Sequence, residues 1–234
     1  MMKTELCAAS LEAIRVAKEL NFDRIELCQN LEQGGITPSF GMIEYAIAYG
    51  IETNVLIRPR VGGFIYNEEE LEVVIRDILA CKSIGVHGIV FGALTNNNEI
   101  DREAMKEIVS KCQGMQLTFH RAFDECVDWK KSMDLLVELG VNRILTSGLS
   151  RSVDKGFESL KKLVEYADGR IEIMAGGGVS SSNILKISQE IKPNAIHFSG
   201  TIKKFIDEDS LFSEECLQID RERVIRMLKA LSKF

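Results

Sequence analysis

The chain has 234 residues, a length at which parallel barrels of about 200–250 residues form one domain. Hydrophobic residues make up 45% of it and charged residues 27%, as in globular proteins with a large core. The net charge of −6 argues against nucleic-acid and anionic-membrane partners, because both attract basic surfaces.

The sequence contains no targeting or membrane signal that we recognise. Residues 1–10 lack the apolar run of a signal peptide, and no stretch reaches the roughly 20 apolar residues of a membrane helix. Six cysteines include no C-x-x-C pair and no zinc-finger spacing. We therefore expect a cytoplasmic protein with reduced thiols. The cysteines are Cys7, Cys28, Cys81, Cys112, Cys126 and Cys216.

Short apolar segments alternate with amphipathic helical patterns along the whole chain. Strands are predicted at residues 4–8, 24–29, 54–59, 88–93, 116–121, 143–147, 172–176 and 195–199. Between them, Asn67 and Glu70 form a capping-box pattern, and Asp101 and Asp128 are predicted to cap two further helices. Strands that alternate with helices in this way predict parallel crossovers.

Eight such units predict an α/β fold of one domain over residues 1–234, the (β/α)8 TIM barrel. An open doubly wound sheet would also alternate, but no G-x-G-x-x-G follows the first strand. The polar stretch 201–219 is predicted as a loop inserted after the eighth strand, with room for a short helix. A last helix is expected over residues 220–231.

Several predicted strands alternate polar with apolar residues, although strands covered on both faces are usually apolar throughout. Alternating side chains share one face of a strand, and the apolar set must meet the helices. We therefore expect the polar set to face the barrel axis near the carboxyl ends of the strands, where barrel sites form. The alternative is a network of charges that only fixes strand register. The set is Glu5, Cys7, Glu26, Cys28, Asn30, Arg58, Arg60, Thr118, His120, His197 and Ser199.

Some of these residues suit acid–base catalysis. His120 is the best candidate for a general acid or base, because imidazole titrates near neutral pH. Glu26 would orient His120 or serve as the base itself. Arg58 and Arg60 offer guanidinium groups for a carboxylate or phosphate. His197 is a weaker candidate, since a single strand histidine is often a hydrogen-bonded core residue.

Glycine-rich loops end the seventh and eighth strands, where barrels often bind phosphate. Gly177 and Gly178 follow the seventh strand, and Ser199 and Gly200 end the eighth. The predicted anion site would use their N–H groups, the hydroxyls of residues 180–182 and the start of the next helix. The alternative is tight turns that need positive φ. Glu5 and Asn30 are further candidate binding residues. The acid, the base and the anion site together predict aldol, isomerisation or lyase chemistry on a small phosphorylated or carboxylated metabolite.

Five ungapped strings resemble the CutC family over nearly the whole chain. They are ELC-x-N-L-x-x-GG-x-TPS at 26–39, IRPR at 57–60, LTFHRAFD at 117–124, RILTSG at 143–148 and GGGV at 176–179. The resemblance implies a cytoplasmic, oligomeric TIM-barrel protein of copper homeostasis, with copper held by Cys7 and Cys28. Ala9 and Gly63 depart from the family, because many CutC proteins carry an acidic residue at these positions.

The two cysteines implied by the resemblance also fit a metal site on chemical grounds. Cys7 and Cys28 each end an E-L-C tripeptide, on strands expected to lie about 4.8 Å apart. Two thiolates suit Cu(I), a soft ion. Glu5 and Glu26 oppose this by disfavouring thiolate formation. The alternatives are two cysteines that act as small apolar residues, and a non-catalytic scaffold whose mouth is covered by residues 201–219.

Overall fold

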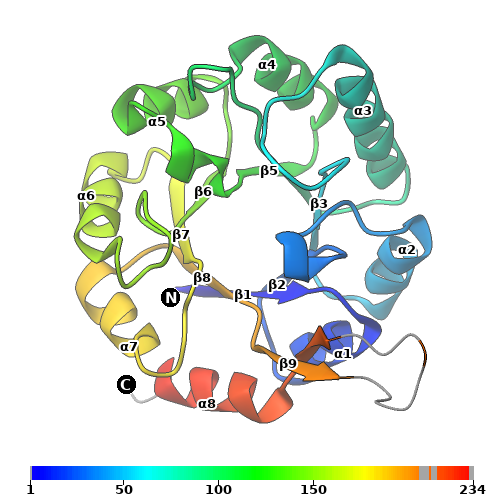
Figure 1. The fold of residues 1–234 in the computed structure, drawn as a ribbon, viewed down its shortest axis with the longest axis vertical. Helices are drawn as coiled ribbons and strands as arrows, with labels where there is room; N and C mark the ends of the chain where they lie inside the picture. The colour runs from blue at the N-terminus through cyan, green and yellow to red at the C-terminus, as the bar shows by residue number, and fades with distance from the viewer. Residues whose placement is uncertain (1, 206–210, 212–214, 232–234) are drawn as a thin grey trace.

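The computed structural model describes residues 2–205, 211 and 215–231. In this part of the chain, eight parallel strands form a closed barrel in the order β1 to β8, with β8 paired to β1. Helices surround the barrel as an outer ring (Figure 1). The predicted (β/α)8 TIM barrel is therefore confirmed, and the open doubly wound sheet is excluded.

The strands match the predicted positions, and most end one to three residues earlier than predicted. They are β1 (Lys3–Ala8), β2 (Arg24–Leu27), β3 (Thr53–Leu56), β4 (Gly88–Phe91), β5 (Gln116–Phe119), β6 (Arg143–Thr146), β7 (Glu172–Gly176) and β8 (Ala195–Phe198). The α-helices are α1 (Leu11–Glu19), α2 (Phe40–Tyr49), α3 (Glu68–Ser83), α4 (Arg102–Lys111), α5 (Trp129–Glu138), α6 (Phe157–Ala167), α7 (Ile184–Lys186) and α8 (Arg221–Leu231). Two 3-10 helices, η1 (Leu31–Gln33) and η2 (Arg121–Glu125), and a π-helical turn, η3 (Ile187–Ile191), complete the set.

The helices begin where polar side chains cap them. Asn67 and Glu70 form a reciprocal capping box at the start of α3, and Asp101 and Asp128 accept hydrogen bonds from the first turns of α4 and α5. These side chains satisfy N–H groups that lack a partner within the helix. All three predicted caps are confirmed.

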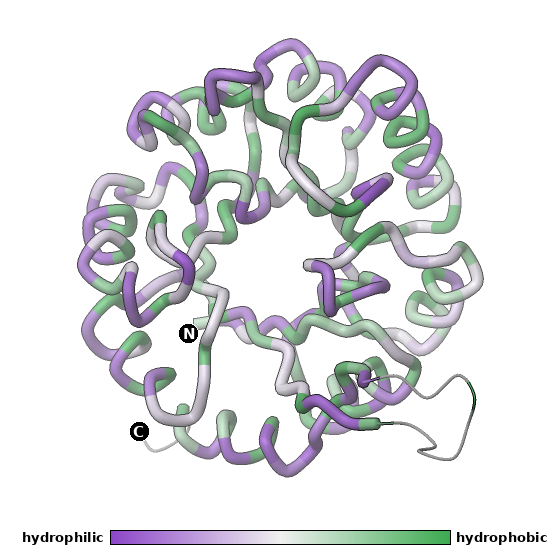
Figure 2. Tube along the Cα trace, viewed as in Figure 1, coloured by the Kyte–Doolittle hydropathy of each residue, from purple (hydrophilic) through white to green (hydrophobic). Residues whose placement is uncertain are grey.

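The main core lies between the barrel and the helices. Fully buried Ile14 of α1, Ile25 of β2 and Ile78 of α3 belong to it, and hydrophobic and hydrophilic stretches alternate along the surrounding helices (Figure 2). The apolar strand residues face the helices, which leaves the other strand face for the barrel interior. That interior holds charged side chains, including fully buried Arg24.

Residues 201–219 were predicted to form a loop inserted after the eighth strand, but both ends of this segment form strands. Strands β9 (Thr201–Phe205) and β10 (Glu215–Ile219) form a separate antiparallel sheet, which overlaps α1 in the view of Figure 1 and contacts η1 through β10. Lys203 and Glu215 form an ion pair of 2.6 Å across it, and Glu32 of η1 accepts a 2.7 Å hydrogen bond from the Leu217 N–H. Cross-strand pairing thus orders a polar segment. Residues 206–210 and 212–214 of the predicted loop lie outside the described residues.

Within the described ranges, no helix combines the length and apolar character needed to cross a membrane.

Candidate functional site

A cavity of about 520 Å³ lies at the carboxyl ends of the barrel strands, within the usual range for small-molecule sites. Cys7, Glu26, Arg58, His120 and His197 line it. These residues come from β1, β2, β8 and the segments that follow β3 and β5. The expectation that polar residues of different strands converge at the mouth is confirmed for these five.

Cys7 and Cys28 form a buried thiol pair. Their Sγ atoms lie 3.8 Å apart, because β1 and β2 are adjacent parallel strands and the Cys28 N–H donates to the Ala8 carbonyl. Cys28 also packs against Leu56 and Val90. The predicted approach of the two sulfurs is confirmed.

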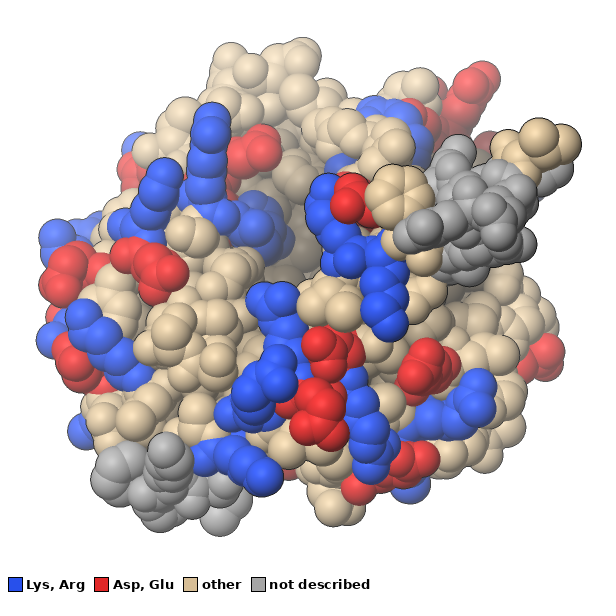
Figure 3. Space-filling model, turned by 60° about the horizontal axis from the view of Figure 1, so that its bottom comes forward, with Lys and Arg blue, Asp and Glu red and all other residues tan. Residues whose placement is uncertain are grey.

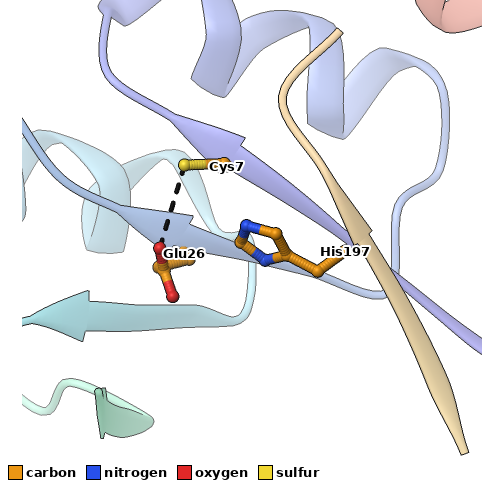
Figure 4. A group of neighbouring side chains, drawn as sticks. All are labelled: Cys7, Glu26 and His197. Carbon is orange, nitrogen blue, oxygen red and sulfur yellow. Dashed lines mark hydrogen bonds between the residues drawn. The ribbon is translucent and has the colours of Figure 1, made fainter. Parts of the chain in front are cut away.

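Two further metal-binding side chains lie beside Cys7. Ligand atoms of Cys7, Glu26 and His197 all lie within 4.8 Å of one another, and Figure 4 shows the three side chains projecting from β1, β2 and β8 toward a common point. Cys7 lies directly opposite Glu26 in the strand register, so the two side chains share a face of the sheet. The Cys7 thiol is 3.8 Å from Glu26 Oε1.

Glu5 lies next to the Cys7, Glu26 and His197 group and contacts His197. It lies opposite both Arg24 and His197 in the register, and accepts from Arg24 Nε at 2.6 Å and from Asn54 Nδ2 at 3.1 Å. His197 Nδ1 lies 2.8 Å from the other Glu5 oxygen. That contact fixes the imidazole and leaves its Nε2 as the nitrogen available to a metal, as carboxylates do for many histidine ligands. Glu5 is therefore a positioning residue.

Burial and neighbouring charges give the Glu5 and Glu26 carboxyl groups different pKa values. Burial alone would raise the pKa of Glu5, but the hydrogen bond and charge of His197, together with Arg24, lower it to about 2. For Glu26, burial and the charge of Glu5 raise the pKa to about 7, against the opposing charge of His197. Burial lowers the pKa of His197, yet Glu26 and Glu5 outweigh it and leave this pKa raised.

His120 is buried beside Arg58 and Phe64. Burial and the charge of Arg58 lower its pKa to about 3, so the expected titration near neutral pH is wrong. Its Nδ1 accepts from the Ala122 N–H at 3.2 Å, capping η2. The ring lies 4.7 Å from that of Phe64, over which the Arg58 guanidinium is also placed. His120 is thus a neutral, tightly held imidazole.

Five predicted site residues do not line the cavity, namely Glu5, Cys28, Asn30, Arg60 and Gly200; Glu5 and Cys28 nevertheless contact residues that do. Arg60 does not face the axis: it pairs with Glu70 of α3 and donates to the carbonyls of Gly63 and Ile65, because the chain leaves the barrel after β3. Asn30 is exposed, with φ of 52°, at the start of η1.

Gly200 also serves the fold. Its carbonyl accepts from the Asp220 N–H, and an added Cβ would lie 2.3 Å from Val224 of α8. Ala9, one of the two departures from the family, packs beside the thiol pair, whereas Gly63 is exposed.

Gly177, Gly178 and Ser199 do line the cavity, but the helix expected after them is short. Helix α7 has three residues, and Asn183 Oδ1 already accepts from the Ser180 N–H at 2.8 Å. A helix N-terminus is therefore not available for an anion here. The loop itself remains at the cavity wall.

The prediction omitted two arginines of the cavity. Arg121 follows His120 directly, and its position at the end of the fifth strand was a usable signal. Arg223 lies on α8 and lines the cavity; its sequence surroundings show only an amphipathic helix. Figure 3 shows Lys and Arg side chains on both sides of the hollow at the mouth.

Together, fold and site define a single (β/α)8 barrel with a polar, thiol-bearing cavity at the carboxyl ends of its strands. The model of the CutC family matches residues 2–202, and the chain belongs to this family. It is 41% identical to a CutC family protein of Glaesserella parasuis over 213 residues, which cover 91% of this chain and 88% of the relative. A CutC family protein of Bacteroides thetaiotaomicron is 40% identical over 217 residues, covering 92% and 86%.

Solved structures agree with the fold. A CutC protein from Streptococcus agalactiae, named for a proposed role in copper homeostasis, superimposes with a TM-score of 0.80 at 43% identity, over 84% of this chain and 98% of that one. Phosphoribosylanthranilate isomerase from Thermotoga maritima gives a TM-score of 0.61 at 12% identity, over the full length of both chains. The second likeness shows the barrel fold alone.

Proposed function

We propose that this CutC protein binds Cu(I) through Cys7 and Cys28 and acts in copper homeostasis. The observation that carries the proposal is the 3.8 Å separation of the two buried Sγ atoms. Soft thiolates suit Cu(I) better than hard cations such as Mg²⁺ or Ca²⁺. The name of the Streptococcus agalactiae relative supports the same role.

The surroundings of the thiol pair fit a metal. Glu26 Oε2 is buried and has no hydrogen-bond partner among the described residues, and His197 is oriented by Glu5. Both lie within reach of Cys7. A metal bound to Cys7 would therefore have the Cys28 sulfur near it on one side, and the Glu26 carboxylate and the His197 imidazole, a group that does not include Cys28, on the other. At Glu26 it would satisfy a polar atom that the described residues leave unpaired.

Metal binding must displace protons from this site. The hydrogen bond to Cys28, burial and the nearby carboxylates raise the pKa of Cys7 well above its ordinary value, so the metal-free site holds a thiol. Because thiolates are the ligands, Cu(I) affinity rises with pH. The family resemblance is also the basis for proposing a cytoplasmic protein that works as a homo-oligomer.

An anaerobic Cu(I) titration against a chromophoric chelator tests the proposal. We expect the wild-type chain to hold one Cu(I) in competition with the chelator, and Cys7→Ser/Cys28→Ser to lose affinity by about 100-fold or more, since even outer-shell changes cost 10–100-fold. Glu5→Gln should weaken binding by about tenfold while keeping the stoichiometry.

The matched control is Cys126→Ser/Cys216→Ser. It removes the same number of thiols from positions outside the cavity lining, and should bind as the wild type does. Equal affinity of the two double variants would show that Cys7 and Cys28 act only as small apolar residues.

A further inference from the structure

Two buried nitrogen donors of the cavity have no partner. His120 Nε2 and Arg58 Nε make no hydrogen bond within the described part of the chain, although their residues are only 6% and 5% exposed. Both residues line the cavity. A buried donor without a partner costs about 1–3 kcal/mol, so its retention at a cavity wall indicates a missing hydrogen-bond acceptor.

The identity of these donors follows from their other contacts. Because His120 Nδ1 accepts from the Ala122 N–H, the proton of the neutral ring lies on Nε2. The other nitrogens of Arg58 are held by backbone carbonyls, with Nη1 at 2.9 Å from Gly35 O and Nη2 at 2.5 Å from Gly62 O. His120 and Arg58 thus carry two fixed N–H groups without an acceptor among the described residues, on side chains that line the cavity.

The walls formed after β7 and β8 offer a second set of donors. The backbone N–H groups of Gly178, Val179 and Ser199 have no acceptor among the residues described. Arg121 uses Nε and Nη2 for Asp124, Ser147 and neighbouring carbonyls. This leaves Nη1, which lies against Gly177 at a spot where a Cβ would come within 2.9 Å.

Arg223 adds a second guanidinium, anchored by a 3.1 Å hydrogen bond from Nη1 to the Thr201 carbonyl. The cavity lining therefore holds three arginines, Arg58, Arg121 and Arg223, against one carboxylate, Glu26. The chain as a whole is acidic, with a net charge of −6. Positive charge concentrated in the cavity of an acidic protein favours an anionic ligand.

We infer that the cavity binds a small phosphorylated metabolite, with its phosphate between Gly178–Val179, Arg121 and Arg223 and a carbonyl oxygen facing His120 Nε2 and Arg58 Nε. The cavity of about 520 Å³ accommodates a molecule of a few carbons. Arginine forks suit phosphate oxygens. The residues assigned to this ligand differ from the proposed Cu(I) ligands, although Cys7 lines the same cavity.

The part of the site assigned to the phosphate is tested by measuring the binding of inorganic phosphate by calorimetry. Arg223→Ala should weaken binding by about tenfold or more, as expected for a lost charged hydrogen bond. Arg226→Ala, exposed on the same helix and absent from the cavity lining, should bind as the wild type does. The anion site is refuted if phosphate does not bind, or if Arg223→Ala binds it as tightly as Arg226→Ala.

Two matched probes test the part of the site assigned to the carbonyl oxygen, at His120 and Arg58. Hydroxyacetone phosphate carries a carbonyl that propyl phosphate lacks, and we expect it to bind about tenfold more tightly. Gly92→Ala should abolish this preference, because the added Cβ would come within 2.7 Å of the His120 ring; circular dichroism checks that it folds. Equal binding of the two probes by the wild type would overturn the oxygen assignment.

The thiol variant separates this inference from the copper proposal. Cys7→Ser/Cys28→Ser should keep both phosphate affinity and the preference for hydroxyacetone phosphate. If this variant lost phosphate binding while Arg223→Ala kept it, the anion would belong to the thiol group and the assignment to the loops after β7 and β8 would be wrong.

Discussion

The Glu26 carboxyl has an unusual acidity because of where β2 places it. It is buried, the charge of Glu5 acts on it, and one of its oxygens lacks a partner among the described residues. Removing a carboxylate from water disfavours its charged form, which explains the rise of its pKa to about 7. A metal or a positively charged group beside it would reverse that effect.

Glu26→Gln should change how stability depends on pH. The folded pKa of about 7 lies above the ordinary value of 4.5, so the folded state holds a proton that the unfolded state releases. The stabilisation that this bound proton gives the folded state is present in full below pH 4.5 and is lost as the pH rises to about 7. Glutamine does not titrate, so the variant does not lose this stabilisation. Between pH 4.5 and 7 its free energy of unfolding should therefore rise by about 2–3 kcal/mol relative to that of the wild type.

Urea denaturation of the metal-free proteins at several pH values measures the difference. Glu12→Gln, at an exposed position on α1, is the control and should follow the wild type throughout. If the free energies of unfolding of the wild type and Glu26→Gln differ by a constant amount from pH 4.5 to 7, the raised pKa does not belong to Glu26.

Individual site residues could be predicted where strand alternation alone decides their direction. Cys7, Glu26 and His197 face the cavity, as the period of two indicates. Arg58 and Arg60 both lie beyond Leu56, the last residue of β3, so alternation decides the direction of neither. The Arg58 backbone is still held by Thr37, whereas Arg60 pairs with Glu70. Arg24 shares the parity of Glu26 and was overlooked, because an arginine at a strand start is usually exposed.

The helices of this barrel start at side-chain caps that are visible in the sequence. In α3, Asn67 Oδ1 accepts from the Glu70 N–H at 2.8 Å, and the Glu70 side chain accepts in return from the Asn67 N–H at 3.0 Å. Glu70 also binds Arg60. One cap thereby fixes both the start of α3 and the loop that follows β3.

Asn67→Ala should destabilise the fold by about 1 kcal/mol, because the first turn of α3 loses its side-chain acceptor. Thermal and urea denaturation measure the change. Asn96→Ala, in an exposed turn, should stay within about 0.5 kcal/mol of the wild type. Equal effects of the two substitutions would mean that the capping box adds nothing to stability.

Elements with a local signal were predicted, and those made by long-range pairing were not. The eight barrel strands carry apolar runs bounded by turn residues. Half of the residues in strands β9 and β10 are polar, and the strands exist through their mutual pairing, in which Lys203 forms an ion pair with Glu215. The Leu217 N–H also donates to Glu32 of η1. Local propensity is weak in such strands, because their stability depends on the partner.

Closure of the whole barrel creates the candidate site. It brings β8 beside β1, so that His197 meets Glu5 across 192 positions of sequence. Counting eight strands predicts this closure, but only the register shows that Glu5 lies opposite His197. Arg223 enters the cavity from α8, which no pattern within its own helix indicates.

The position of bound copper in crystals loaded anaerobically with Cu(I) tests the central claim most directly. In an anomalous difference map recorded at the copper edge, the account predicts a peak within bonding distance of both Cys7 Sγ and Cys28 Sγ, absent from crystals of Cys7→Ser/Cys28→Ser. A map without a peak at the thiol pair, or with copper only at Cys126 or Cys216, would contradict it.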